Sequence, residues 1–316
     1  METHNHSAVT TVTEFILMGI TDNPKLQAPL FGVFLVIYLV TVMGNLGTVI
    51  LTHLDAKLHT PMYFFLRHLA ITDLGYSTAI GPKMLASFVV QRNTISSGCC
   101  AAQLASLEVF IIAEFFILSA MAYDRHAAIC KPLVYAVIMA QRVRWALVLA
   151  PYAYGTFVSL FLTVKLFRLP FCGPDTISYF YCDCLPLLSL LCSDTRELEL
   201  IVCIFSGCNL LSSLSVVLVS YGFILVALVR MKSPEGRRRA FSTCSAHLTV
   251  VVVFYGTLLS IYLRPRASRA AHADQAASVF YTLVIPMLNP LIYSLRNREV
   301  KDALKRTLTK RCRSSA

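Results

Sequence analysis

The segment Ala28–Thr52, APLFGVFLVIYLVTVMGNLGTVILT, runs for 25 residues without a formally charged side chain. A helix that crosses a bilayer needs about 20 mostly apolar residues, so this segment is long enough to span one. The composition of the chain agrees, because 56% of its 316 residues are hydrophobic and only 14% are charged. A soluble domain carries about 25% charged residues. The sequence therefore indicates a membrane protein, and it excludes an ordinary cytosolic enzyme and a disordered chain.

Six further segments extend this pattern. Four of them are almost free of charge, whereas Thr60–Pro82 and Asn93–Tyr123 each contain two charged residues but are still long enough to cross. The seven expected spans are Ala28–Thr52, Thr60–Pro82, Asn93–Tyr123, Trp145–Val164, Leu200–Val229, Ala240–Leu263 and Gln275–Leu295. The fold class that we predict is an all-α membrane protein, a seven-transmembrane helix bundle.

The distribution of Lys and Arg predicts the orientation of the bundle. The side that carries the carboxyl terminus holds 19 of the 28 basic residues, and the opposite side holds 9. Because cytoplasmic loops are rich in Lys and Arg, we expect an extracellular amino-terminal segment (1–27), a transmembrane domain (28–296) and a cytoplasmic tail (297–316). The net charge of +11 does not indicate binding to nucleic acid, since the basic residues separate apolar runs and do not cover one face.

Two features of the expected extracellular side agree with this orientation. Asn5-His6-Ser7 is an acceptor sequence for glycosylation at Asn5, which requires a lumenal position, although a chance tripeptide is the alternative. The loop between the fourth and fifth spans is rich in cysteine, and disulfides persist on the oxidising side of the membrane. Its cysteines are Cys172, Cys182, Cys184 and Cys192.

The tail predicts a short amphipathic helix on the inner leaflet. Val300, Leu304 and Leu308 recur at helical spacing among many Lys and Arg residues. Such a helix binds the anionic cytoplasmic surface of a bilayer. Cys312 is either a free thiol or a site of acylation.

Four polar residues are expected inside the membrane at related depths. At about 1.5 Å of rise per residue, Asp73 lies roughly 18 Å from the cytoplasmic end of its helix, and Glu114 lies roughly 16 Å from the same side. Asn45 and Asn289 lie somewhat lower on the first and seventh spans. Because a charge in the bilayer is costly, the cluster needs a function or a partner. It could share a proton, hold a cation such as sodium, or form a structural hydrogen-bond network.

Glu108 is a separate acidic residue, about 12 Å below Cys100 at the outer end of the third span. It lies in an otherwise apolar stripe at helical spacing. The stripe contains Leu104, Leu107, Glu108, Ile111, Ile112 and Phe115. Such stripes are more often core, with the acid bonded to a neighbouring helix, but an unpaired acid here favours contact with a ligand.

The sequence lacks the motifs of an enzyme. It contains no Gly-x-Ser-x-Gly, His-Glu-x-x-His or phosphate-binding glycine loop. A second class to consider is a transporter that uses Asp73 and Glu114 as a proton or cation path. Transporters often show inverted repeats and broken helices, neither of which is evident, and seven spans do not divide into equal halves.

Five motifs in the expected order resemble one family. They are Leu58–Leu66 (LHTPMYFFL), Met121–Leu133 (MAYDRHAAICKPL), Ser220-Tyr221, Ala240–Leu248 (AFSTCSAHL) and Pro286–Asn297 (PMLNPLIYSLRN). The chain resembles the vertebrate olfactory receptors, which are rhodopsin-like (class A) G-protein-coupled receptors, and Phe64-Phe65 resembles their tetrapod-type (class II) group. The resemblance implies a plasma-membrane receptor that binds a small volatile odorant and activates a stimulatory G protein of the olfactory type, raising cyclic AMP.

The same resemblance implies roles for individual residues. Activation and G-protein coupling are expected of Asp124, Arg125, Tyr221, His247, Asn289, Pro290 and Tyr293. Disulfides are expected between Cys100 and Cys182 and between Cys172 and Cys192. Asp73 and Glu114 match a buried acidic pair of the family. This match favours a bound sodium ion, and no other cofactor is expected.

The ligand pocket that the resemblance implies is mainly apolar, as small volatile ligands require. Its expected residues are Leu104, Leu107, Glu108, Ile111, Ile112, Phe205, Asn209, Tyr255, Leu258, Leu259, Tyr262, Val279 and Thr282. Four residues depart from the family pattern. His126 replaces the usual tyrosine, Cys99 stands beside Cys100, Cys184 lacks an obvious partner, and Glu108 replaces a frequent histidine.

Glu108 also suggests a class of ligand. A carboxylate in an apolar pocket loses solvation unless it is paired, and a protonated amine would supply the pair. The alternative is a protonated Glu108 that binds neutral alcohols, aldehydes or acids.

Overall fold

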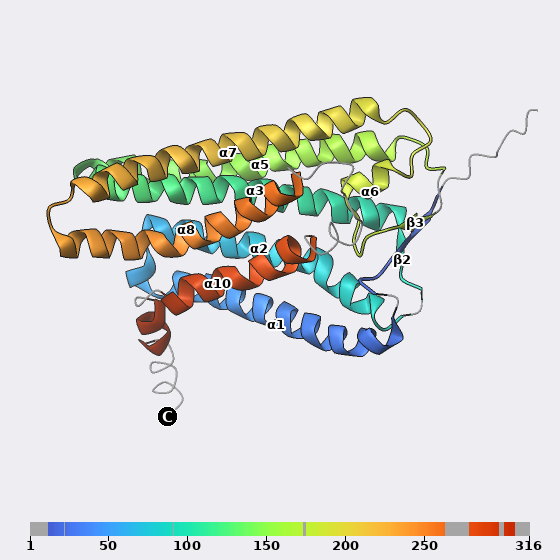
Figure 1. Ribbon diagram of the computed structural model, residues 1–316, viewed down its shortest axis with the longest axis horizontal. Coiled ribbons are helices and arrows are strands. Elements are labelled where there is room, and N and C mark those ends of the chain that lie inside the picture. Colours follow the sequence, from blue (N-terminus) through green and yellow to red (C-terminus); the bar gives the residue numbers. More distant parts are fainter. Residues whose placement is uncertain are drawn as a thin grey trace, which may run out of the picture.

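The computed structural model describes residues 12–21, 23–90, 92–172, 175–262, 278–296 and 300–306. Long helices lie side by side in an elongated bundle (Figure 1). They are α1 (Pro24–Leu54), α2 (Pro61–Ser87), α3 (Ser97–Cys130), α5 (Gln141–Phe167), α7 (Arg196–Arg230), α8 (Pro234–Tyr262) and α10 (Ile285–Arg296). The π-helical turn η4 (Phe280–Val284) precedes α10. The bundle has the helices that the seven expected spans require.

Short elements join the long helices. They are η1 (Ala56–Leu58), η2 (Pro132–Val134), α4 (Tyr135–Ile138) and α6 (Cys184–Leu188). Residues 300–306 are helical and follow α10 (Figure 1). This segment contains Val300 and Leu304 of the predicted tail helix, whereas Leu308, Cys312 and the acceptor Asn5 lie outside the described residues.

The helices differ in how strongly they resemble membrane spans. By length and composition alone, four described helices are able to cross a membrane: α1, α3, α5 and α7. Helix α8 makes a fifth if its two parts, which meet at 41°, form one span. The apolar sequence of helix α2 is interrupted by the charged residues Arg67 and Asp73. The apolar helical stretch Phe280–Tyr293 is shorter than a full span. Arg67 is satisfied internally, since it donates to the carbonyl of Thr52 and to its hydroxyl at 3.2 Å.

Local sequence explains where the helices begin. The Asn23 side chain accepts a hydrogen bond from the backbone N–H of Lys25 at 3.0 Å, and Pro24 occupies the first helical position of α1. The hydroxyl of Ser96 accepts from the N–H of Cys99 at 3.3 Å and caps α3. Such caps satisfy N–H groups that have no partner within the helix.

Small residues allow α3 to pack closely against α5. A Cβ atom added at Gly155 would lie 3.2 Å from the backbone oxygen of Val109. One turn further along α5, the Ser159 hydroxyl donates to the carbonyl of Ala105 at 2.7 Å. Glycine and serine are typical of helix contacts in membranes, where close approach replaces a hydrophobic driving force. This contact fixes the position of the part of α3 that carries Glu108.

The amino-terminal segment and two loops form a small sheet that the all-α prediction did not include. It consists of β1 (Glu14–Leu17), β2 (Thr94–Ser96) and β3 (Thr176–Ile177), in the order β2-β1-β3. Strand β1 pairs antiparallel with β2 and parallel with β3. Phe15 and Leu17 are buried in a core shared with Cys100 and Cys182. The amino-terminal segment is therefore bound to the loop between α2 and α3 and to the loop between α5 and α7.

Two disulfides hold the loop between α5 and α7 in place. Cys100 at the start of α3 bonds Cys182, with their Cα atoms 5.5 Å apart. Cys172 bonds Cys192 within the same loop, with Cα atoms 5.2 Å apart. These are the pairings that the family resemblance implied, and Cys99 is left as an exposed free thiol.

Candidate functional site

A cavity of about 90 Å³ lies in the outer half of the bundle, among α3, α5, α7 and α8. Its lining residues are Glu108, Ile111, Ile112, Phe115, Val158, Leu162, Phe205, Ser206, Asn209 and Leu258. The lining is mainly apolar with a few polar groups, as is typical of small-molecule sites. An apolar cavity of about 150 Å³ is known to bind benzene, so a ligand of that size requires some side chains here to shift.

Glu108 is the one carboxylate that lines this cavity. Its Oε2 atom is buried and has no hydrogen-bond partner among the described residues. Asp183, in the second extracellular loop, lies close enough to interact with it electrostatically. Burial raises the pKa of Asp183, although the N–H of Cys184 and the hydroxyl of Tyr181 donate to its carboxylate. The cavity thus has an acidic group whose Oε2 atom lacks a hydrogen-bond partner in the part of the chain that the structure describes.

The structure brings six of the predicted pocket residues to the cavity and places others nearby. Leu104 and Leu107 are buried in separate core clusters beneath the extracellular loops. The Tyr255 hydroxyl donates to the carbonyl of Phe115 at 3.3 Å, which places it against a cavity-lining residue. Leu259 packs against the central core of the bundle. The side chain of Tyr262 is outside the described part of the structure.

Two of the predicted pocket residues belong to the seventh span and do not line the cavity. Val279 packs against the core formed by α2 and the extracellular loop, and the buried Thr282 hydroxyl donates to its own helix at Ser278. In their place, the cavity draws on α5 through Val158 and Leu162. These two residues are four apart and so share one helix face, which was a signal available in the sequence.

The polar residues Asn45, Asp73, Glu114 and Asn289 lie on α1, α2, α3 and α10, and the structure joins two of them directly. The Asn289 amide donates to both carboxylate oxygens of Asp73, at 3.2 and 3.0 Å. Asn45 donates to the carbonyls of Thr41 and Pro286, each at 3.0 Å. Among the described residues, Glu114 Oε1 and Asn289 Oδ1 are buried without a hydrogen-bond partner. The cluster therefore retains two buried oxygen atoms able to accept a further bond.

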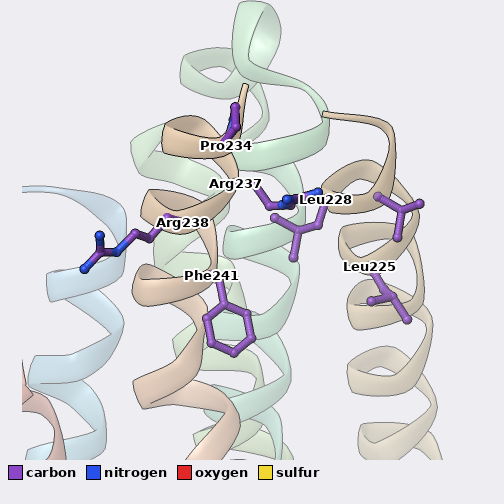
Figure 2. Close-up of a pocket in the computed structure, with 7 residues that line it drawn as sticks. Leu225, Leu228, Pro234, Arg237, Arg238 and Phe241 are labelled. Atoms are coloured by element: carbon purple, nitrogen blue, oxygen red, sulfur yellow. The ribbon is translucent and has the colours of Figure 1, made fainter. Parts of the chain in front are cut away.

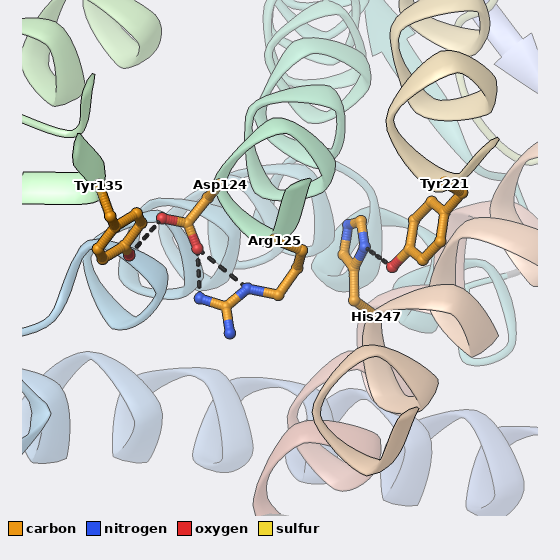
Figure 3. A network of polar contacts seen from close by, with 5 residues as sticks. All are labelled: Asp124, Arg125, Tyr135, Tyr221 and His247. Carbon is orange, nitrogen blue, oxygen red and sulfur yellow. Dashed lines mark hydrogen bonds and ion pairs between the residues drawn. The ribbon is translucent and has the colours of Figure 1, made fainter. Parts of the chain in front are cut away.

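A second polar network lies at the carboxyl-terminal end of α3 (Figure 3). Asp124 is fully buried. One of its carboxylate oxygens accepts a hydrogen bond from Arg125 Nε at 3.0 Å and another from a second nitrogen of the same guanidinium. The hydroxyl of Tyr135 in α4 donates to the other oxygen of Asp124 at 2.7 Å. Burial beside this carboxylate raises the pKa of Tyr135, so the hydroxyl remains a donor. The network holds Arg125 against α3.

Tyr135 was not identified from the sequence. It lies four residues after Lys131, in the segment that follows α3. The sequence pattern did not place Tyr135 and Asp124 on a common helix face. The signal that could have found it is its place in the motif-rich segment after Arg125. A tyrosine there can reach back because Pro132 begins the turn η2 and redirects the chain.

The inner tyrosine of α7 is bound to α8. Tyr221 and His247 have stacked rings, and the Tyr221 oxygen lies 2.7 Å from His247 Nδ1 (Figure 3). His247 Nε2 lies 3.2 Å from the carbonyl of Leu118, which can only accept. Nε2 is therefore the protonated nitrogen, and Tyr221 donates to Nδ1. His247 joins α3, α7 and α8 at one point.

The other predicted activation residues lie in α10. The Tyr293 hydroxyl is buried and has no hydrogen-bond partner in the described part of the chain. Pro290 packs against α1, where a Cβ atom added at Gly44 would lie 2.9 Å from it.

His126, one of the departures from the family pattern, faces Phe223 of α7 with ring centroids 5.4 Å apart. Cys184 is a buried free thiol at the start of α6.

The helical segment 300–306 is bound to the connection between α1 and α2. Arg306 donates to Asp55 through two nitrogens, at 3.1 and 2.8 Å. The Arg306 guanidinium holds the pKa of Asp55 below its ordinary value. This pair fixes the segment beside η1.

The arrangement of helices corresponds to one class of membrane protein. The structure superposes on the crystal structure of squid rhodopsin with a TM-score of 0.68, covering 91% of this chain and 86% of that chain at 16% sequence identity. The fold is therefore that of the rhodopsin-like seven-helix receptors.

The sequence comparisons then define the family. A model of the olfactory receptor family matches residues 34–311. Human Olfactory receptor 8K1 is 74% identical over 98% of this chain and 97% of its own length, and human Olfactory receptor 8K3 is 62% identical over 99% of both. Mouse Olfactory receptor 8U3 is 56% identical over 96% of this chain and 95% of its own length. The chain belongs to the olfactory receptor family, whose members are multi-pass proteins of the plasma membrane.

Proposed function

We propose that this receptor binds small volatile odorants in the outer cavity and activates a stimulatory G protein of the olfactory type, which raises cyclic AMP. The observation that carries the proposal is the mainly apolar cavity of about 90 Å³ at the meeting of α3, α5, α7 and α8. A ligand there contacts four helices and can favour one of their arrangements over another. The amino terminus faces outward and the carboxyl terminus faces the cytosol.

The cavity is connected to the cytoplasmic network through α3 and α8. Leu258 lines the cavity, Tyr255 follows one turn below it, and His247 lies two further turns along α8. A shift of α8 that accommodates a ligand therefore acts on the contact between His247 and Tyr221. Opening of that contact frees space beside Arg125, which leaves Asp124 and engages the G protein.

The buried carboxylate favours amines as ligands. Glu108 Oε2 has no hydrogen-bond partner among the residues that the structure describes, and an unpaired charge is costly in an apolar site. A protonated amine supplies both a positive charge and N–H donors. If Glu108 is instead protonated, the same atom binds neutral alcohols, aldehydes or acids.

Cyclic AMP measurements in cells that co-express the receptor and an olfactory-type G protein test both proposals. We expect a volatile panel to contain agonists that include amines, and Glu108→Gln to weaken the amine responses at least about tenfold, because a charged hydrogen bond of about 1.5–3 kcal/mol is lost. Arg125→Ala should abolish every response.

Surface display of each variant serves as the control. Equal amine responses of wild type and Glu108→Gln would refute the amine proposal and leave the receptor function intact. Agonist responses that persist in Arg125→Ala at equal surface level would refute the coupling mechanism.

We further propose that the cluster of Asp73, Glu114 and Asn289 holds a sodium ion. Hard cations take oxygen ligands, and two buried oxygens of this cluster, Glu114 Oε1 and Asn289 Oδ1, have no hydrogen-bond partner within the described ranges. A buried acceptor without a partner costs about 1–3 kcal/mol. A shared proton or a purely structural network are the alternatives.

Sodium binding is tested by thermal unfolding of the purified receptor in sodium chloride and in choline chloride at equal ionic strength. We expect sodium to raise the melting temperature, since a ligand at about 100 times its Kd adds about 2.7 kcal/mol of stability. Asp73→Asn should remove the difference between the two salts. An equal effect of both salts on the wild type would exclude sodium.

A further inference from the structure

A groove of about 500 Å³ lies between the cytoplasmic ends of α7 and α8, and its lining shares no residue with the ligand cavity or with the activation residues of Figure 3. Leu225, Leu228 and Val229 of α7 form one wall, and Arg237 and Phe241 of α8 form the other. Figure 2 shows the Arg237 side chain extending across the groove toward Leu228. The groove combines an apolar surface with a guanidinium at its cytoplasmic end.

The apolar walls are exposed, although they belong to helices that lie in a membrane. Leu225 is 63% exposed, Val229 is 72% exposed and Phe241 is 59% exposed. At this depth, the apolar neighbours available to cover such side chains are lipid acyl chains. The groove is large enough to receive part of one lipid acyl chain.

The positive charge around the groove favours a lipid with an anionic headgroup. Residues 230–238 contain four basic residues and one acidic residue. Arg237 and Arg238 form no ion pair with any residue that the structure describes, so their charges are free for an external anion. Arg238 also lines the groove, but in Figure 2 its side chain extends away from Leu225 and Leu228. Arg237 is therefore the residue placed to hold a phosphate.

We infer that this groove is a binding site for an anionic phospholipid of the inner leaflet, in particular a phosphoinositide. The Arg237 guanidinium binds a headgroup phosphate through two N–H groups, which match phosphate geometry. One acyl chain lies against Leu225, Val229 and Phe241. Clusters of basic residues at the cytoplasmic surface attract such lipids. The inference depends on the proposed orientation of the chain but not on the proposed odorant.

The test measures lipid binding directly, with the full-length receptor in nanodiscs of phosphatidylcholine and a trace of fluorescent phosphatidylinositol bisphosphate. We expect energy transfer from a fluorescent donor on the carboxyl-terminal, cytoplasmic tail of the receptor to report a saturable complex. Arg237→Ala should weaken binding about tenfold, as expected for the loss of a charge-assisted bond. Arg237→Lys should retain part of the affinity, because it keeps the charge but not the paired N–H groups.

Matched controls separate this site from general attraction to charge. Arg142→Ala removes one exposed positive charge from the same side of the receptor and should leave binding unchanged. Phe241→Gln should weaken binding of the lipid but not the weak binding of soluble inositol trisphosphate. Equal losses in Arg142→Ala and Arg237→Ala, or equal affinity for the lipid and the soluble headgroup, would overturn the inference. Because no odorant or G protein is present, these outcomes are independent of signalling.

Discussion

Replacement of Cys100 by serine is expected to remove nearly all folded receptor from the cell surface. The bond from Cys100 to Cys182 joins residues 82 apart in the sequence and attaches the second extracellular loop to α3. Loss of a disulfide that closes a loop of this length costs about 4–5 kcal/mol in the chain-entropy account. That is a large part of the 5–15 kcal/mol by which proteins are typically stable. Surface labelling and thermal unfolding measure the effect.

Cys99 supplies a matched control one residue away. It is exposed and free, so Cys99→Ser should display and unfold as the wild type does. Cys172→Ser should lie between the two, because its bond to Cys192 spans only 20 residues. Normal display of Cys100→Ser together with loss of display in Cys99→Ser would assign the bridge to Cys99.

Asp124→Asn is expected to raise basal cyclic AMP strongly in the absence of odorant. Removal of one partner of a buried ion pair costs about 3–5 kcal/mol. In the proposed mechanism, the pair with Arg125 exists only in the inactive arrangement, so its loss shifts the population toward the active one. A change of about 3 kcal/mol corresponds to about a hundredfold shift in that ratio. Basal cyclic AMP, divided by surface level, is the quantity to measure.

A substitution at Tyr135 should give an intermediate level of basal activity. Tyr135→Phe removes one hydrogen bond to Asp124 but leaves the ion pair, so its basal activity should lie between those of wild type and Asp124→Asn. Glu235→Gln removes an exposed acid from the same side of the receptor and should change nothing. A basal level in Asp124→Asn no higher than in Glu235→Gln would contradict the role assigned to the pair.

The fold could be predicted from the sequence because its determinants are local. A span such as Ala28–Thr52 is recognised by length and hydrophobicity alone, and α1 contains it entirely. Depth along a helix is a matter of counting residues, and this placed Asp73 and Asn289 in one cluster. The free position of Cys99 could not be obtained in this way, because two adjacent cysteines have the same hydropathy and nearly the same depth.

The remaining features depend on how helices face one another. Val158 and Leu162 reach the cavity because Gly155 lets α5 approach α3, and a periodic pattern does not say which neighbour a face meets. Thr282 was expected in the pocket but bonds the carbonyl of Ser278, and it lies within a π-helical turn that the sequence did not indicate. Tyr135 reaches Asp124 through a bend of the loop. Each of these follows from tertiary packing.

The three-stranded extracellular sheet has a practical consequence for the design of tagged receptors. Strand β1 is its central strand, paired on one edge with β2 and on the other with β3. An epitope placed before Val12 leaves both edges intact. An epitope inserted between Glu14 and Leu17 separates the first extracellular loop from the second and exposes Phe15, so poor display of such a fusion would reflect the insertion point and not the receptor.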